Sequence, residues 1–243
     1  MKTNLLKISF IFVAIILYSC SNTSKELKIA EFIDKPNIIL FVADDHGTDA
    51  LGCYGNPVIK TPNLDKLASE GTMFNNAYCT TASCAASRSV ILSGKFGHAT
   101  GSYGHVHDYH HFSTYDNVKS LPVILENDGY ETARVGKYHV APEIVYHFNT
   151  VLEANPRNTV EMAEQCRTVL NSEKPFFLYF CTDDPHRGHP FEPDPWNTPN
   201  SFGNKVEGYT GIESVTYDPK DVLVPSFLPD TKESREEIAQ YYQ

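Results

Sequence analysis

The chain has 243 residues, of which 41% are hydrophobic and 21% are charged. This composition is typical of a globular protein and excludes a disordered tail, a collagen and a coiled coil. The formal net charge is −10 and the sequence pI is about 5.4, which argues against a nucleic-acid partner, because such proteins usually carry a basic surface. The length allows one large α/β domain or two small ones.

The first 35 residues have the features of a targeting segment. Two lysines precede an apolar run over residues 8–17, which is shorter than the ~20 residues that span a bilayer. The tetrapeptide that ends in Cys20 is similar to a bacterial lipobox. We therefore expect a lipoprotein signal peptide over residues 1–19, a lipidated Cys20, a tether over 20–35, and an exported, lipid-anchored bacterial protein in the periplasm or at the cell surface. Secretion without lipidation is the alternative.

From residue 36 onward, apolar runs alternate with amphipathic segments. The continuous apolar run at 37–43 is typical of a strand buried on both faces. Thr61-Pro62 begins a helix that Gly71 ends. The other predicted elements are short strands at 73–78 and 130–135, a buried strand at 176–181, helices beginning at 87–92 and covering 120–127, 159–171 and 234–243, and long loops over 188–229. This alternation predicts a mainly parallel α/β sheet flanked by helices.

Polar side chains follow three of the predicted strands. Asp44 and Asp45 come directly after the first strand, Lys137 and His139 follow the strand at 130–135, and His186 follows the last. Because ligands of parallel sheets bind beyond the carboxyl ends of the strands, we expect these side chains to converge at one edge.

Two short motifs suggest chemistry at that edge. Adjacent carboxylates such as Asp44 and Asp45 repel each other unless a cation lies between them, and oxygen ligands suit Ca²⁺ or Mg²⁺. Cys84 precedes a helix start, where backbone N–H groups favour an anion, and Arg88 follows one turn later, where its charge favours a thiolate. Taken alone, each motif also fits a commoner structure, namely a solvated turn and a small buried cysteine.

Several motifs together resemble the sulfatase family. The segment from Cys84 to Gly94, which contains Cys-Ala-Ala-Ser-Arg, resembles the sulfatase signature, and residues 37–45, 61–68, 136–139 and 184–186 resemble further family motifs in the same order. The resemblance covers residues 35–243. Residues 103–104, 108–112, 119–122, 136–143, 184–187 and 217–225 resemble in particular the sulfamidase branch, which acts on N-sulfoglucosamine in heparan-type glycans. It implies an alkaline-phosphatase-like α/β fold, with residues 36–243 as an incomplete N-terminal catalytic domain.

The resemblance also implies a site and a mechanism. The motif cysteine is oxidised to formylglycine by a maturation enzyme, and the resulting aldehyde hydrate attacks the sulfur of a sulfated glycan. A divalent cation, Ca²⁺ in the family, assists this attack. The implied metal ligands are Asp44, Asp45 and the modified Cys84; the implied catalytic residues are Cys84, Arg88, Lys137, His139 and His186; and the implied substrate-binding residues are Lys137, His186, Asp108, His110 and His111. The expected partners are the glycan, the maturation enzyme and, through the lipid, a membrane.

Two departures from the family pattern qualify these expectations. Ala86 stands where many sulfatases have proline, and the family's second pair of metal ligands is not found before Gln243. We therefore expect an N-terminal portion with little activity by itself. Two other functions remain open: a phosphatase or phosphodiesterase of the same fold that uses unmodified Ser or Thr, and an inactive lipid-anchored glycan-binding fragment.

Overall fold

The computed structural model describes residues 35–107, 109, 111–188, 202 and 215–243. The chain divides into two units, residues 1–35 and 36–243, and the fold described below is that of the second. The predicted signal peptide, Cys20 and nearly all of the tether lie outside the described residues, as do Asp108 and His110. No helix in the described part of the chain is long and apolar enough to cross a membrane.

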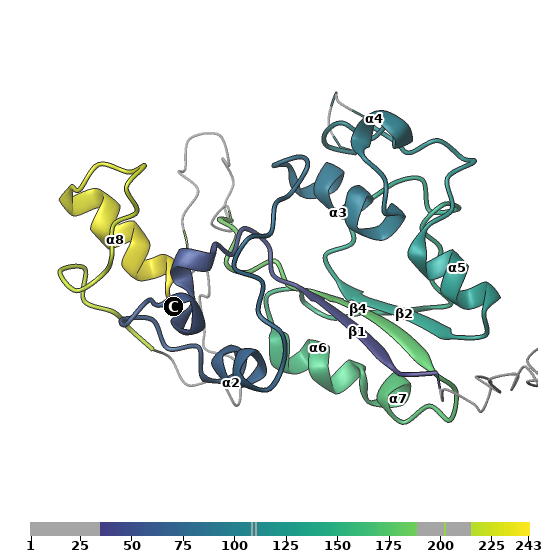
Figure 1. Ribbon diagram of the computed structural model, residues 1–243, viewed down its shortest axis with the longest axis horizontal. Coiled ribbons are helices and arrows are strands. Elements are labelled where there is room, and N and C mark those ends of the chain that lie inside the picture. The colour runs from purple at the N-terminus through teal and green to yellow at the C-terminus, as the bar shows by residue number, and fades with distance from the viewer. Residues whose placement is uncertain (1–34, 108, 110, 189–201, 203–214) are drawn as a thin grey trace, which may run out of the picture. The chain divides into compact units, whose positions relative to one another are not determined.

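A parallel four-stranded sheet forms the centre of this unit (Figure 1). Its strand order is β1-β4-β2-β3, and all three neighbouring pairs are parallel, as predicted. The strands are β1 (Ile38–Val42), β2 (Glu131–Gly136), β3 (Thr150–Leu152) and β4 (Phe176–Cys181). The three-residue strand β3 was not predicted, because so short a segment carries no clear alternation of polar and apolar residues.

Strand β4 is the buried centre of the sheet, and all six of its residues are buried. Because successive side chains of a strand point to opposite faces, Phe177 and Tyr179 belong to one hydrophobic cluster, whereas Phe176 and Leu178 belong to another. The first cluster includes residues from α3 and α5, and the second includes residues from α6 and α7, so helices cover both faces (Figure 1).

The helices agree with most of the predicted positions. They are two 3₁₀-helices, η1 (Thr48–Ala50) and η2 (Gly52–Tyr54), and the α-helices α2 (Pro62–Glu70), α3 (Cys84–Ser93), α4 (Gly97–Thr100), α5 (Leu121–Asn127), α6 (Thr159–Gln165), α7 (Arg167–Leu170) and α8 (Lys232–Tyr241). The helix predicted at 159–171 is thus two helices joined at Cys166, and α3 begins three residues earlier than predicted.

The strand predicted at residues 73–78 was wrong. This segment is irregular, and Phe74 and Tyr78 are 68% and 88% exposed. A strand needs a hydrogen-bonded neighbour, and no described strand pairs with this segment. Its apolar residues are therefore not core residues within the part of the chain that the structure describes.

Helix α8 fixes the loop that follows β1. Ile238, Ala239 and Tyr242 pack with Ala50 and Val222 in a third hydrophobic cluster. The hydroxyl of Tyr241 donates to the carbonyl oxygen of Asp45 at 2.8 Å and accepts from the backbone N–H of Gly47 at 3.0 Å. The last helix therefore holds the backbone that carries the acidic pair.

Gly136, the last residue of β2, has a left-handed backbone that lies close to the carbonyl oxygen of Cys181. Its φ is +79°, and a Cβ added there would lie 2.1 Å from the carbonyl oxygen of Cys181. Gly129 has a similar φ of +88° but nothing within 4 Å. We expect Gly136→Ala to lower the free energy of unfolding by about 3 kcal/mol or more, and Gly129→Ala to lower it by about 1 to 2 kcal/mol, because only the first adds a steric overlap to the left-handed backbone. Urea denaturation of both variants measures this difference, and equal losses would contradict it.

Candidate active site

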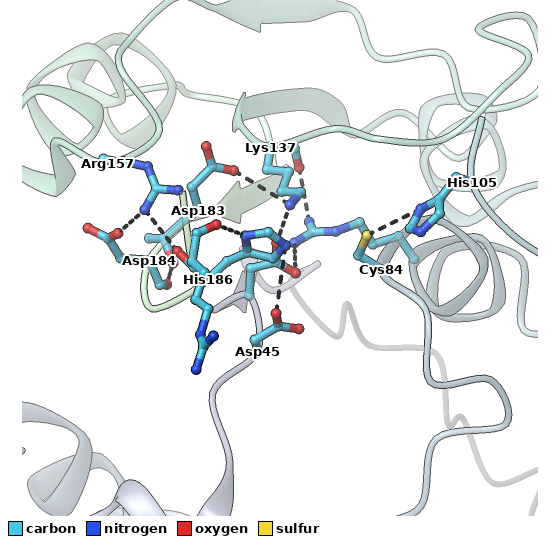
Figure 2. Close-up of polar contacts among 12 residues, drawn as sticks. Asp45, Cys84, His105, Lys137, Arg157, Asp183, Asp184 and His186 are labelled. Atoms are coloured by element: carbon cyan, nitrogen blue, oxygen red, sulfur yellow. Dashed lines mark hydrogen bonds and ion pairs between the residues drawn. The ribbon is translucent and has the colours of Figure 1, made fainter. Parts of the chain in front are cut away.

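The carboxyl ends of three neighbouring strands bring the predicted polar residues together. Val42 of β1 pairs with Cys181 of β4, which in turn pairs with Gly136 of β2. The residues that follow these strands therefore meet at one edge of the sheet, where the side chains of Asp45, Lys137 and His186 cluster (Figure 2). The predicted convergence is confirmed.

Asp44 is a buried carboxylate between two cations. It is only 5% exposed, its Oδ2 forms a short ion pair with Lys137 Nζ, and its Oδ1 lies 3.4 Å from Arg88 Nη2. Lys137 Nζ also lies 3.8 Å from Asp183 Oδ1. Burial makes these pairings matter more than surface ion pairs, since water screens them less.

Arg88 connects helix α3 to the sheet edge. Its side chain is 2% exposed, and its Nη1 donates to the Lys137 carbonyl oxygen at 3.0 Å and to the Tyr179 hydroxyl at 3.2 Å. Burial opposes the positive charge, but Tyr179, Cys181 and Asp44 outweigh this effect and raise the pKa of Arg88 above its ordinary value. The guanidinium is therefore charged at all physiological pH values and rigidly held.

Cys84 is the first residue of α3, and its Sγ lies 3.8 Å from Nδ1 of His105 (Figure 2). Burial raises the pKa of this thiol, and the opposing effects of Lys137 and Arg88 are smaller. Arg88 therefore favours the thiolate, as expected, but the effect of burial on the pKa of Cys84 is larger. At neutral pH the unmodified side chain is a thiol, so this site does not activate cysteine itself as a nucleophile.

His139 lies beside Cys84 in a stack of imidazole rings. Its ring centroid is 5.7 Å from that of His105 and 4.9 Å from that of His107, and the planes are nearly parallel. Both ring nitrogens are buried without a hydrogen-bond partner. Burial, followed by the charge of Lys137 and the two neighbouring histidines, lowers the pKa of His139 to about 4. The ring is therefore neutral at pH 7 and able to accept a proton or a hydrogen bond.

This lowered pKa predicts a pH dependence of stability. The unfolded ring has a pKa of about 6.5, so between pH 6.5 and about 4 the unfolded state binds more protons than the folded state, and stability falls as the pH falls. From pH 7 to pH 5 this effect amounts to about 2 kcal/mol of unfolding free energy. We expect the loss of unfolding free energy from pH 7 to pH 5 to be smaller by about that amount in His139→Gln. His147→Gln is the control, because it keeps the His139 ring and therefore the loss of the parent. Urea denaturation at both pH values tests this, and parallel losses in all three proteins would contradict it.

His186 and Asp45 form the more exposed side of the site. His186 Nε2 lies 3.7 Å from Asp45 Oδ2, and the Asp45 side chain is 64% exposed. Arg157 supports this loop, since its Nη1 forms a short ion pair with Asp184 and donates to the His186 carbonyl oxygen at 3.0 Å. Asp45, with a φ of 60°, is one of the few described non-glycine residues with a left-handed backbone.

Of the remaining predicted substrate-binding residues, the structure describes only His111. His111 is exposed, and its backbone is left-handed with a φ of 44°. Asp108 and His110 lie outside the described residues. Their roles stay predictions. The residues that sequence reasoning missed are His105 and Arg157, which lie in loops and carry no motif.

The donor chemistry of the acidic pair fits a hard cation. Asp44 and Asp45 offer carboxylate oxygens, the ligand type that Ca²⁺ prefers, but Ca²⁺ takes six to eight oxygens. Lys137 already neutralises one oxygen of Asp44, so a divalent cation there would compete with its ammonium group. These two residues therefore suit part of a calcium site.

Comparison with known proteins decides the family. The family model described as Sulfatase matches residues 36–242. The chain belongs to the sulfatase family. Its fold is the predicted alkaline-phosphatase-like α/β fold.

Several individual proteins are similar to this sulfatase. Human N-sulphoglucosamine sulphohydrolase is 39% identical over 219 residues, which cover 85% of this chain and 43% of the human protein. A solved structure of a protein in complex with its substrate D-glucosamine-2-N,6-O-disulfate is 28% identical, with a TM-score of 0.53 over 63% of this chain and 35% of that protein. A Bacteroides fragilis structure matches with a TM-score of 0.60 over 89% of this chain and 56% of its own, and at 20% identity it supports the fold alone. The sulfatase chain thus spans less than half the length of its human relative.

Proposed function

We propose that the whole protein releases sulfate from sulfated glycans, with N-sulfoglucosamine of heparan-type chains as its favoured substrate. The observation that carries this proposal is the placement of Cys84, at the N-terminus of α3 and within the electrostatic reach of Lys137, Asp44 and Arg88. The similarity to the human sulphohydrolase, at 39% identity, supports the choice of an N-sulfated substrate.

Two groups would complete this chemistry. Formylglycine, made from Cys84 by a maturation enzyme, supplies a hydrated aldehyde as the oxygen nucleophile for sulfur. Asp44 and Asp45 would hold part of a Ca²⁺ site, and the ion would supply a positive charge that makes a nearby hydroxyl more acidic. We propose both the conversion of Cys84 to formylglycine and the binding of Ca²⁺.

The chain's own residues then have distinct roles. Lys137 and His186 bind sulfate oxygens and offset the negative charge that develops on them in the transition state. Neutral His139 accepts a proton from the hydroxyl at position 84. The departing nitrogen of an N-sulfate must be protonated, and Lys137 and His186 are the two candidate donors. Arg88 stays charged and holds both Lys137 and Asp44 in place.

The test is sulfate release by the whole protein, matured and supplied with Ca²⁺. We expect turnover of N-sulfoglucosamine and less or none of glucosamine-6-sulfate. Release only from O-sulfated sugars would contradict the N-sulfate preference. Turnover of phosphate esters with zinc, undiminished in Cys84→Ala, would favour the phosphatase or phosphodiesterase. Glycan binding without turnover under any metal would favour the glycan-binding protein.

We also propose that Cys20 is lipidated and anchors the protein to a membrane after export. Cys20→Ala is expected to move the protein from the membrane fraction to the soluble fraction of its host, because an acyl anchor contributes ~0.8 kcal/mol per buried CH₂. Immunoblotting of the two fractions measures this change. Retention of Cys20→Ala in the membrane fraction would contradict the anchor.

A further inference from the structure

Cys84, His105 and His139 form a second cluster of potential metal ligands. The Cys84 sulfur and one ring nitrogen from each histidine all lie within 4.8 Å of one another. They come from three separate elements: the first turn of α3, the loop after α4 and the loop after β2. Figure 2 shows Cys84 and His105 facing each other on the side of the site away from Asp184.

His139 provides an independent reason to expect a ligand here. Both of its ring nitrogens are buried, and neither has a hydrogen-bond partner. A buried polar atom without a partner costs about 1 to 3 kcal/mol, so native structures rarely leave one without a function. A metal ion at the cluster would give one of these nitrogens a partner.

The ligand types select the ion. A thiolate with two imidazoles suits Zn²⁺ and other borderline or soft ions, whereas Ca²⁺ prefers oxygen. In a tetrahedral zinc site with bonds of about 2.3 Å to sulfur and 2.0 Å to nitrogen, sulfur and nitrogen lie roughly 3.5 Å apart. The observed separation of Cys84 Sγ and His105 Nδ1 is 3.8 Å, so little contraction is needed.

One adjustment is required before both histidines can bind one ion. Their ring planes are 14° from parallel, so their in-plane lone pairs do not meet at a point. Rotation of one ring about its Cβ–Cγ bond corrects this, and that torsion is soft for histidine. The three side chains are therefore close enough to bind one metal ion once one imidazole ring has rotated.

We propose that the unconverted form of the protein binds Zn²⁺ through Cys84, His105 and His139, with a fourth position open to water. Binding releases the thiol proton to solvent, and the sulfur donates an electron pair to the ion with no change of oxidation state. Conversion of Cys84 to formylglycine removes the sulfur, so this zinc site belongs only to the unconverted protein. The proposal does not depend on sulfatase activity.

The experiment uses the chain produced in a host without a maturation enzyme, with the thiol at Cys84 verified by mass spectrometry. Zinc chloride is titrated calorimetrically into the parent, Cys84→Ala and His105→Ala, with Cys79→Ala and His147→Ala as controls at an exposed cysteine and an exposed histidine. We expect one Zn²⁺ per parent chain and an affinity about 100-fold weaker in the two ligand variants, since even outer-shell changes weaken metal binding 10- to 100-fold. The two controls should match the parent.

Cobalt substitution gives a readout that does not rely on the folding of variants. Co²⁺ bound to the parent should show a sulfur-to-cobalt charge-transfer band, which persists in Cys79→Ala. Equal zinc affinity in the parent and Cys84→Ala, or a cobalt complex of the parent without that band, would overturn the proposal. Loss of sulfate release in the matured protein would instead bear only on the proposed function.

Discussion

Replacing Cys84 by alanine is expected to reduce sulfate release by the matured whole protein about 10⁴-fold or more. The substitution removes the atom that maturation converts into the nucleophile, and loss of a nucleophile in other hydrolases costs up to ~10⁶ in kcat. Stability should change little, because the substitution removes one partly buried sulfur atom. The measurement is the initial rate of sulfate release, together with a thermal unfolding curve.

Cys79→Ala is the matched control for this prediction. Cys79 is an exposed cysteine five residues earlier in the same segment, and the structure gives it no role at the strand ends. It should release sulfate at the parent rate. If Cys84→Ala kept the parent rate as well, the formylglycine mechanism would be wrong, and an unmodified hydroxyl would have to act as the nucleophile.

The sequence was sufficient to predict the strands whose carboxyl ends carry this site. Strand β4 was predicted at its observed bounds from its continuous apolar run. The similar run at 37–43 was wrongly expected to be buried on both faces, because it forms the outer described strand β1, in which Ile39 and Phe41 are 55% and 52% exposed. The positions of Asp44 and Lys137 followed from the same reasoning, since the end of a buried strand fixes where the next residue lies. Helix α3 was placed three residues late, although Ser83, the residue before its observed start, is of a type favoured at the N-cap of a helix.

What the sequence did not predict depends on loop conformation. The stack of His105 on His139 joins residues from two loops. The pKa of His139 is lowered mainly by burial, which only the folded structure defines. The ion pair of Arg157 with Asp184 likewise joins two loops. No periodicity of apolar residues determines such contacts, so a motif search finds the strand ends and misses their supporting side chains.

Asp44 and Asp45 are neighbours in the sequence, but their substitution should have different effects on stability. Asp44 is buried between Arg88 and Lys137, so Asp44→Asn leaves two positive charges close together without their carboxylate. We expect this to lower the free energy of unfolding by about 3 to 5 kcal/mol, the usual cost of breaking a buried ion pair. Asp45 is largely exposed, and within the described residues its one ion pair is with His186 at 3.7 Å, so Asp45→Asn should change stability by about 0.5 kcal/mol or less.

Calcium affinity tests the proposed metal-binding role of Asp44 and Asp45 separately from their different effects on stability. If both carboxylates bind Ca²⁺, as proposed, both variants should bind it more weakly, although only Asp44→Asn is destabilised without metal. Urea denaturation in the presence of a chelator measures the first property, and calorimetric titration of the whole protein with Ca²⁺ measures the second. Unchanged calcium affinity in Asp45→Asn would remove that residue from the metal site. Equal stability of the two variants would show that Asp44 does not balance Arg88 and Lys137, because a buried carboxylate that does so cannot lose its charge without cost.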